Sequence, residues 1–381
     1  MTEWIGKELS RKILLNPGPA TTSSAVKRAQ LVEDICPREA EFGDLIARVR
    51  EKCTAVVHGH PDYETVLLGA SGTGAVEACL TSCVDRERGA VVIIENGAYG
   101  ERMTAICRSS GIPCENITFD WGTPIDPEII AAHLAERNGR ISALAFVHHE
   151  TTVGILNPLD TLTALGKPYG LDVIVDAMSS YAGLPIDLRS TPVDYLISSS
   201  NKCIQGMAGL GIVVANDQAL ERSREHRNAN YYFNLYKNYR SQKMERQFLF
   251  TPPVQVLYAL EAALDEFFTE SGEARFERYA SLYRILLEGM TQLGFKTLVE
   301  PDHHAMLLTA FIEPDHPRYD FDAMHDFFFA RGITIYPGKC PRHDTFRIAN
   351  IGDLVAGDMT LFLVLMGEYL TSEGISPLYQ L

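Results

Sequence analysis

The sequence lacks an excess of positive charge. Its 49 acidic residues outnumber 34 lysines and arginines and leave a formal net charge of −15. Proteins that bind nucleic acid or anionic membranes carry basic surfaces, so this balance argues against both kinds of partner. It is compatible with a locally basic pocket for a small anion. We therefore expect small-molecule chemistry, with no nucleic-acid or membrane partner.

Long apolar runs are missing as well. No stretch approaches the roughly 20 apolar residues of a membrane-spanning helix, and the N-terminal MTEWIGKELSRKILL has no signal-peptide core. The eight cysteines form no CxxC pair, and the pairs His58/His60 and His148/His149 have no second half at metal-ligand spacing. We expect reduced cysteines, a cytoplasmic protein and no metal site.

The residues that are present have an ordinary globular balance. Of 381 residues, 46% are hydrophobic and 22% are charged, which is enough for a sizeable core. Apolar runs that predict strands alternate with helical patterns, at 63–70, 90–94, 141–149, 171–176, 193–199 and 209–214. This alternation predicts an α/β fold with a mostly parallel sheet and helices on both faces.

The two ends of the chain differ in character from this middle part. Residues 13–23, ILLNPGPATTS, contain Pro17, Gly18 and Pro19, which interrupt a helix or a central strand. After about residue 273, long helices and short strands predict a small α+β unit. We therefore predict an N-terminal arm (1–23), a large domain (24–270) and a small C-terminal domain (271–381).

Two single polar residues stand near the ends of neighbouring apolar runs. LDVIVDAMSS (171–180) contains Asp176, and VDYLISSSNKCIQGMAGLG (193–211) contains Lys202 after a small polar cluster. A lone lysine of this kind is most often a solvated loop residue. Together with the aspartate it favours a site for pyridoxal phosphate (PLP), where the lysine forms a Schiff base and the aspartate pairs with the pyridinium nitrogen.

A glycine-containing turn follows the predicted strand 63–70. Ser71-Gly72-Thr73-Gly74 opens a helical pattern, and the backbone N–H groups at a helix start bind phosphate. Neither a Walker motif nor GxGxxG is present, and a tight turn with a capping serine explains the pattern equally well. Tyr99 follows the next strand, either to stack on a planar cofactor or to fill a half-buried packing position.

Taken together, these motifs resemble the class-V aminotransferases of fold-type I over nearly the whole chain. The resemblance rests on LLNPGPATTS (14–23), GASGTGAVEA (69–78), NGAYGERM (96–103), HETTVGILNP (149–158), VDAMSSYAGLPID (175–187), SSSNKCIQG (198–206), YPGK (336–339) and FRIANIG (346–352). It implies a large domain with a mostly parallel seven-stranded sheet and a smaller C-terminal α+β domain. The chain is most similar to the phosphonate branch, which exchanges an amino group between 2-aminoethylphosphonate and pyruvate.

The resemblance also implies roles for individual residues. Lys202 and Asp176 would be catalytic, and the cofactor contacts would also include Ser71, Gly72, Thr73, Tyr99, Thr152 and Thr251. Thr251 would reach the phosphate bound by a neighbouring subunit, which implies a homodimer with shared active sites. Arg347 would grip the acidic group of the substrate, with Asn16 and Gly18 also at the substrate. Without the resemblance, a surface ion pair is the simpler explanation for Arg347.

The expected reaction is a ping-pong transamination. A small amine such as 2-aminoethylphosphonate gives its amino group to PLP and leaves as phosphonoacetaldehyde, and pyruvate then accepts the group and leaves as alanine. Lys202 is the expected general base. The net direction in the cell is open, and a biosynthetic role would reverse it.

Three alternatives stay open at this point. One is the same fold with another donor, such as a different aminophosphonate, or with alanine–glyoxylate or serine–pyruvate exchange. The second is a PLP lyase or desulfurase, for which Cys340 is the cysteine in a plausible place. The third is a non-catalytic protein that kept the fold. Asn16 and His149 depart from the phosphonate branch, which has Thr and Ser there, so the exact donor is open.

Overall fold

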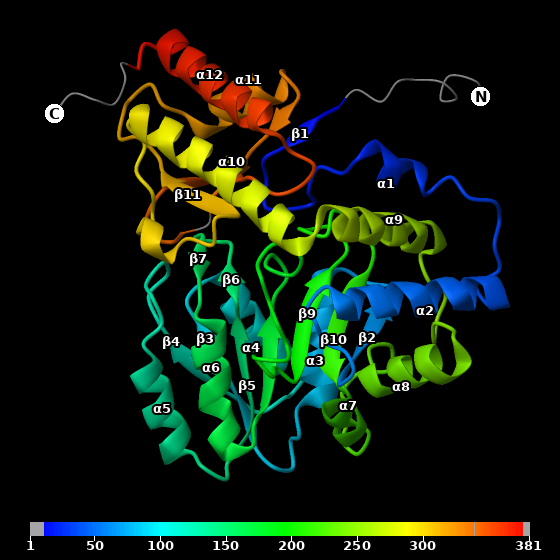
Figure 1. Ribbon diagram of the computed structural model, residues 1–381. Helices are drawn as coiled ribbons and strands as arrows, with labels where there is room; N and C mark the ends of the chain where they lie inside the picture. The colour runs from blue at the N-terminus through cyan, green and yellow to red at the C-terminus, as the bar shows by residue number, and fades with distance from the viewer. Residues whose placement is uncertain (1–10, 339, 376–381) are drawn as a thin grey trace.

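The computed structural model describes residues 11–338 and 340–375, and a seven-stranded sheet forms its centre (Figure 1). The strands are β2 (Tyr63–Leu68), β3 (Ala90–Glu95), β4 (Cys114–Thr118), β5 (Ile141–Val147), β8 (Asp172–Asp176), β9 (Tyr195–Ser199) and β10 (Gly211–Asn216). Their order is β2-β10-β9-β8-β5-β3-β4. Neighbours from β4 to β9 are parallel, whereas β10 is antiparallel to both β9 and β2. The predicted mostly parallel sheet of seven strands is confirmed.

Helices cover both faces of this sheet, which explains why its strands are continuous apolar runs. One face packs against α2 (Ala40–Ala55), α5 (Pro127–Glu136), α6 (Leu159–Gly166) and α9 (Val254–Glu270). The other packs against α3 (Gly72–Cys83), α4 (Ala98–Ser109), α7 (Asp217–Ser223) and α8 (Leu235–Arg240). Alternate residues of β5 divide between the two cores, with Leu144 and Phe146 on the first face and Ala143 and Ala145 on the second.

The parallel strands bring their carboxyl ends to one edge of the sheet. Val147 of β5 is paired with Asp176 of β8, which is paired with Ile197 of β9. The chain segments that follow these strands therefore start side by side. In open α/β sheets this edge is where ligands bind.

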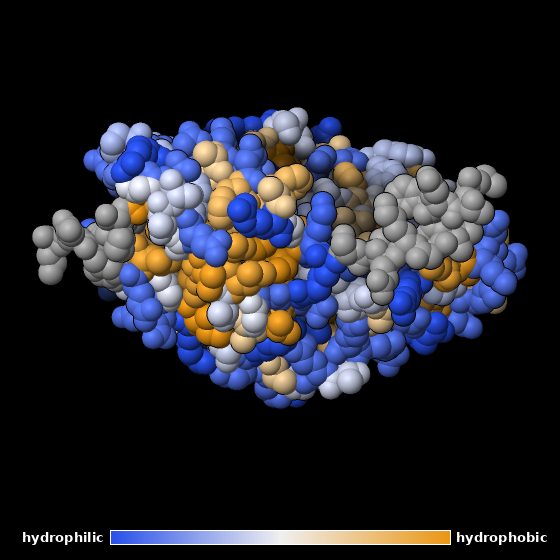
Figure 2. Space-filling view, turned by 90° about the horizontal axis from the view of Figure 1, so that it is seen from above, coloured by the Kyte–Doolittle hydropathy of each residue, from blue (hydrophilic) through white to orange (hydrophobic). Residues whose placement is uncertain are grey.

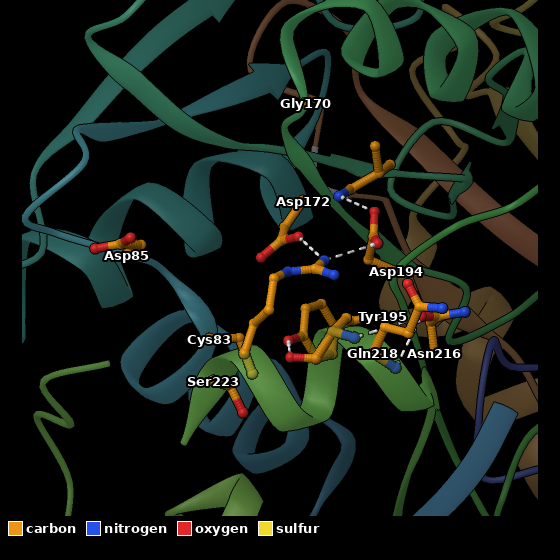
Figure 3. A network of polar contacts seen from close by, with 12 residues as sticks. Cys83, Asp85, Gly170, Asp172, Asp194, Tyr195, Asn216, Gln218 and Ser223 are labelled. Carbon is orange, nitrogen blue, oxygen red and sulfur yellow. Dashed lines mark hydrogen bonds and ion pairs between the residues drawn. The ribbon is translucent and has the colours of Figure 1, made fainter. Parts of the chain in front are cut away.

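A network of ion pairs occupies the opposite edge of the same strands (Figure 3). Arg222 of α7 places Nη2 2.5 Å from Asp172 Oδ1 and 3.4 Å from Asp194 Oδ1. Asp194 Oδ2 also accepts a hydrogen bond from the Val173 backbone at 2.8 Å and lies 3.1 Å from Lys167 Nζ. The network joins the start of β8 to the segment before β9 and to α7.

The C-terminal unit lies against the carboxyl edge of the large sheet (Figure 1). It contains an antiparallel sheet in the order β11-β14-β13, with bounds Leu308–Ile312, Thr345–Ala349 and Tyr336–Pro337. Helices α10 (Gly272–Gln292), α11 (Phe321–Phe329) and α12 (Ala356–Ser372) pack around it. The predicted boundary at residue 270 falls between α9 and α10, and the three domain ranges stay a prediction.

The N-terminal arm pairs with this C-terminal unit. Strand β1 (Ile13–Leu14) is parallel to β12 (Ile333–Thr334), and Ile13 and Leu15 are buried in the C-terminal core. The arm then passes the carboxyl edge of the large sheet and enters α1 (Ser24–Arg28). Residues 1–10 of the predicted arm lie outside the described residues.

Exposed apolar side chains gather around α12. Figure 2, which looks down on the C-terminal unit, shows an apolar area there, and Val355, Leu361 and Val364 are 56%, 44% and 54% exposed. Over the described part of the chain, every helix is too short or too polar to cross a membrane.

Candidate active site

A cavity of about 300 Å³ lies at the carboxyl edge of the large sheet. It is bounded by the ends of β5 and β8, the segment after β9, and the first turns of α3 and α4. Six residues that the sequence singles out line it together: Ser71, Gly72, Thr73, Tyr99, Asp176 and Lys202. They come from four separate parts of the chain, which the parallel topology brings to one place.

Lys202 lies in the segment after β9, and its amine is directed at the N-terminal arm. Its Nζ donates a hydrogen bond to the Pro17 carbonyl at 2.8 Å. Gly18 has a φ of +142°, and a Cβ there would lie 2.3 Å from Lys202 Nζ. Burial lowers the pKa of Lys202, and the charges of Arg347 and Arg102 act in the same direction. A deprotonated amine is the form that attacks a carbonyl carbon or accepts a proton.

Asp176 is the last residue of β8 and is only 6% exposed. Its Oδ1 accepts a hydrogen bond from the Met178 backbone N–H at 2.9 Å. Burial raises its pKa to about 6, although the Met178 bond and the charges of Arg102 and Lys202 oppose this rise. A buried carboxylate of this kind gains free energy when a cationic or protonated group of a ligand pairs with it.

The first turn of α3 forms a cradle on another wall of the cavity. Ser71 is the N-cap residue of this 12-residue helix, followed by Gly72 and Thr73. A Cβ at Gly72 would lie 2.2 Å from the Met178 sulfur, so a larger residue here would have to displace the Met178 side chain. The free N–H groups of a helix start, with the Ser71 and Thr73 hydroxyls beside them, suit a phosphate group.

Tyr99 lines the cavity together with an arginine that we did not predict. The Arg102 guanidinium carbon lies 4.7 Å from the centre of the Tyr99 ring, and its Nη1 donates to Thr73 Oγ1 at 3.3 Å. Arg102 therefore links the aromatic wall to the α3 cradle. Tyr99 and Arg102 are three residues apart on α4 and therefore share a helix face, which the sequence showed only in their spacing.

The structure places Thr151, rather than Thr152, on the cavity wall. Thr152 is fully buried, and its Oγ1 donates to Glu150 Oε1 at 2.5 Å and accepts from the Ala98 N–H at 3.3 Å. Glu150 also accepts from the backbone of Tyr99 at 3.0 Å, and burial raises its pKa to about 7. Thr152 thus holds the start of α4 through the Ala98 N–H, and its neighbour Thr151 faces the cavity.

Arg347 lies on β14 behind this wall and is 2% exposed. Its Nε donates to the Pro337 carbonyl at 3.1 Å and its Nη1 to the Thr151 carbonyl at 3.3 Å. Burial lowers its pKa, whereas Tyr99 and Glu150 raise it. No carboxylate of the described residues forms an ion pair with it, so a surface pair does not explain Arg347.

Three further predicted residues do not line the cavity. Asn16 is 2% exposed and donates from Nδ2 to the Pro19 carbonyl at 3.0 Å, so it shapes the arm beside Lys202. Gly18 lies against the Lys202 amine. Thr251 is exposed and precedes α9. The substrate roles of Asn16 and Gly18 and the intersubunit role of Thr251 stay predictions.

The residues of the cavity fit PLP in kind. An amine, a buried carboxylate and a hydroxyl-flanked helix start face one another, and PLP presents an aldehyde, a ring nitrogen and a phosphate. Tyr99 and Met178 supply apolar surface for the ring on the same cavity. Within the described ranges, no cluster of three or more His, Cys, Asp or Glu side chains is arranged to hold a metal ion.

Comparisons with known proteins agree with this chemistry. The family model for class-V aminotransferases matches residues 24–340. The 2-aminoethylphosphonate–pyruvate transaminase of Salmonella typhimurium is 39% identical over 355 residues, covering 92% of this chain and 95% of that protein. The Salmonella schwarzengrund protein of the same name gives the same identity and coverage.

Solved structures support the fold. Ureidoglycine–glyoxylate aminotransferase from Bacillus subtilis superposes with a TM-score of 0.88 at 20% identity, covering 98% of this chain and 96% of that one. Alanine–glyoxylate aminotransferase from Nostoc sp. gives 0.88 at 24% identity, with 97% and 99% covered. The match of the family model over most of the length, together with the site described above, places this chain among the class-V aminotransferases, as a PLP-dependent transaminase.

Proposed function

We propose that this transaminase exchanges an amino group between 2-aminoethylphosphonate and pyruvate, yielding phosphonoacetaldehyde and alanine. The relatives that bear this name support the substrate pair. One observation of the structure carries the proposal: Arg347 is a buried guanidinium bonded to neutral carbonyls and not to a carboxylate of the described residues. A buried cation that no carboxylate contacts directly is expensive, so an anionic ligand is its natural partner. The planar fork of arginine suits both phosphonate and carboxylate oxygens.

Each residue of the site has a task in this reaction. When bound, PLP withdraws electrons from the substrate carbon that carries the amino group. Asp176 pairs with the ring nitrogen and keeps a proton on it. Lys202 holds the cofactor between turnovers and, once released, moves a proton to or from that substrate carbon. Arg347 fixes the acidic end of the substrate, so that the amino end lies near Lys202.

We propose that the enzyme is a homodimer in which Thr251 contacts the phosphate bound by the partner subunit. Exposed aromatic side chains near Thr251 support an interface there. Tyr231 is 84% exposed, its ring lies 6.0 Å from that of Phe250, and Tyr232 stacks on Phe250 at 4.6 Å. Tyrosine and phenylalanine are enriched in protein interfaces.

The cytoplasmic location also stays a proposal, supported by eight cysteines that are all unpaired.

The direct test is the half-reaction of the purified holoenzyme. We expect 2-aminoethylphosphonate, added without keto acid, to convert the cofactor from its aldehyde-derived form to its amino form, followed by absorbance. Pyruvate should reverse the change. Alanine, serine and 1-aminoethylphosphonate run in parallel as other donors. If 2-aminoethylphosphonate leaves the spectrum unchanged while another donor converts it, the phosphonate assignment fails and the transaminase assignment stands.

Arg347→Ala tests the observation that carries the proposal. This variant should keep the cofactor absorbance and lose most activity with both substrates, because both acidic groups depend on the same guanidinium. Arg342→Ala is a matched control, since Arg342 forms an exposed pair with Asp120 at 2.7 Å. Full activity of Arg347→Ala would contradict the assignment of the anion site.

A further inference from the structure

His149 presents a buried nitrogen without a hydrogen-bond partner at the active site. The side chain lines the cofactor cavity and also a narrow space between the cavity, Pro17 and the C-terminal unit. The residue is only 2% exposed, and its Nε2 has no hydrogen-bond partner among the described residues. Leaving a buried polar nitrogen unpaired is unfavourable, so the position favours a ligand that supplies the missing partner.

The other ring nitrogen of His149 is held by Ser179. Ser179 Oγ lies 3.0 Å from His149 Nδ1 and 3.2 Å from the His149 carbonyl oxygen. The hydroxyl has one proton, and the carbonyl can only accept it. The arrangement that satisfies both contacts has Ser179 donating to the carbonyl and Nδ1–H donating to Ser179. Nε2 then carries a lone pair, so its missing partner is a hydrogen-bond donor.

The position of His149 is next to the groups that must hold the substrate. Two residues further along, Thr151 lines the same cavity, and its carbonyl accepts the bond from Arg347 at 3.3 Å. Pro17, which bonds Lys202 at 2.8 Å, lines the narrow space together with His149. A substrate held between the Lys202 amine and the Arg347 guanidinium would therefore pass beside His149.

We propose that His149 Nε2 accepts a hydrogen bond from the protonated oxygen of a phosphonate monoanion, and that His149 thereby favours aminophosphonates over amino acids. This inference rests on the proposed function. A phosphonate has three oxygens, of which the Arg347 fork binds at most two. A singly ionised phosphonate keeps one P–OH donor, whereas a carboxylate at neutral pH has no proton to donate.

The surroundings of His149 keep this nitrogen available as an acceptor. Burial lowers the pKa of His149 to about 3, and its titratable neighbours His148, His304 and Lys202 all act in the same direction. With a pKa this low, the ring is neutral at pH 7 before a ligand binds. A pH effect on phosphonate recognition must then come from the phosphonate or from other groups of the site.

Two substitutions separate the two nitrogens of the ring. In His149→Asn the shorter amide takes the place of Nδ1 and keeps the contact with Ser179, but nothing replaces Nε2. In His149→Gln the longer amide reaches the place of Nε2. For Asn we expect KM for 2-aminoethylphosphonate to rise about tenfold, the loss of one neutral hydrogen bond. KM for alanine and the cofactor spectrum should not change, and Gln should restore the phosphonate KM toward that of the wild type.

Equal changes for both substrates in His149→Asn, or no change for either, would overturn the proposal. Wild-type enzyme that fails to convert 2-aminoethylphosphonate would instead remove the proposed function itself, so the two failures are distinguishable.

A measurement on the wild type covers the case in which His149→Asn does not fold. If the monoanion is the bound form, the ratio of KM for 2-aminoethylphosphonate to KM for alanine rises about tenfold per pH unit above the second ionisation of the phosphonate. Taking the ratio to alanine cancels the titration of Lys202. A ratio that is flat, or that falls as pH rises, would show that the dianion is bound and would overturn the proposal.

Discussion

The two ends of strand β8 carry the same residue type in opposite settings. Asp172, at the start, is 8% exposed, and Arg222 lies 2.5 Å away. Asp176, at the end, is 6% exposed and is bonded to the Met178 backbone N–H. Each end also has a lysine: Lys167 pairs with Asp194 in the network at the start, and Lys202 lies in the cavity with Asp176.

The difference shows that side chains at one edge of the sheet stabilise the fold, whereas side chains at the other edge line the candidate active site. At the start of β8, Arg222 pairs with both buried carboxylates and fastens α7 to the strands (Figure 3), and it opposes the rise in the Asp172 pKa that burial and Asp194 cause. At its end, Asp176 and Lys202 share a cavity, and burial shifts the pKa of each toward its neutral form. Groups held in this state make the empty protein less stable and serve a ligand that supplies their partners.

The two lysines give the largest expected contrast. Lys202→Ala should lower kcat by at least about 10³-fold, because Lys202 is the proposed general base and the proposed point of covalent attachment of the cofactor. Lys167→Ala should leave kcat near that of the wild type, since Lys167 pairs with Asp194 at 3.1 Å, far from the cavity. Steady-state assays of the two variants, with cofactor content measured by absorbance, check this. Comparable losses of kcat in both variants would contradict the assignment of catalysis to only one end of β8.

The two aspartates should differ by a smaller factor. Asp176→Asn keeps the size of the side chain and removes the charge that we propose pairs with the ring nitrogen. We expect kcat to fall on the order of 10²-fold, comparable to removing one preorganised electrostatic contact. Asp172→Asn is the matched control on the same strand, and its kcat should stay near that of the wild type. An Asp176→Asn enzyme with unchanged kcat would contradict the role given to this carboxylate.

Arg222→Met, at the start of β8, should lower the stability of the fold and leave kcat unchanged. It leaves two buried carboxylates, Asp172 and Asp194, without their shared cation. We expect a loss of about 2–3 kcal/mol in the free energy of unfolding, reduced from a fully buried pair because the Arg222 side chain is 49% exposed. Arg189→Met, which breaks an exposed pair with Asp187, should have a much smaller effect on the free energy of unfolding. Urea unfolding of the two variants measures the difference.

The pH dependence of the cofactor-free protein gives the smallest effect. Burial raises the pKa of Asp176 from 3.8 to about 6, so between these values the native state binds more protons than the unfolded state. The contribution of Asp176 to stability is therefore present below pH 4 and is lost as pH rises through 6. We expect a loss on the order of 2 kcal/mol across this window, since one pKa unit is about 1.4 kcal/mol.

Asp176→Asn should flatten that part of the stability profile, whereas Glu150, with its pKa raised from 4.5 to about 7, continues to act at higher pH. Unfolding of both proteins by urea at a series of pH values measures this. An identical slope in the variant would mean that Asp176 is not held unfavourably in the empty site.

Much of the fold and of the candidate site was predictable from sequence, because it depends on which residues directly follow each predicted strand. Asp176 and Lys202 each follow an apolar strand, and the parallel topology brings such positions to one edge. The α3 cradle follows a strand in the same way. Tyr99 follows β3, and the resemblance to a known family assigned it a role that the residues alone left open.

The remaining parts of the site depend on side-chain direction and on contacts distant in sequence. Thr151 and Thr152 are adjacent and chemically alike, and only the course of the chain after β5 decides which one faces the cavity. Arg102 enters the site by stacking on Tyr99. The unpaired Nε2 of His149 is visible only once Ser179 is seen to occupy the other nitrogen.

The central claim is that the amine at the carboxyl edge of the sheet is the one that carries the cofactor. Reduction of the holoenzyme with borohydride makes that attachment permanent, and peptide mass spectrometry then identifies the modified lysine. We expect the phosphopyridoxyl mass on the peptide that contains Lys202 and on no other lysine. Modification at Lys167 or any other lysine, or a holoenzyme that reduction leaves unmodified, would contradict it.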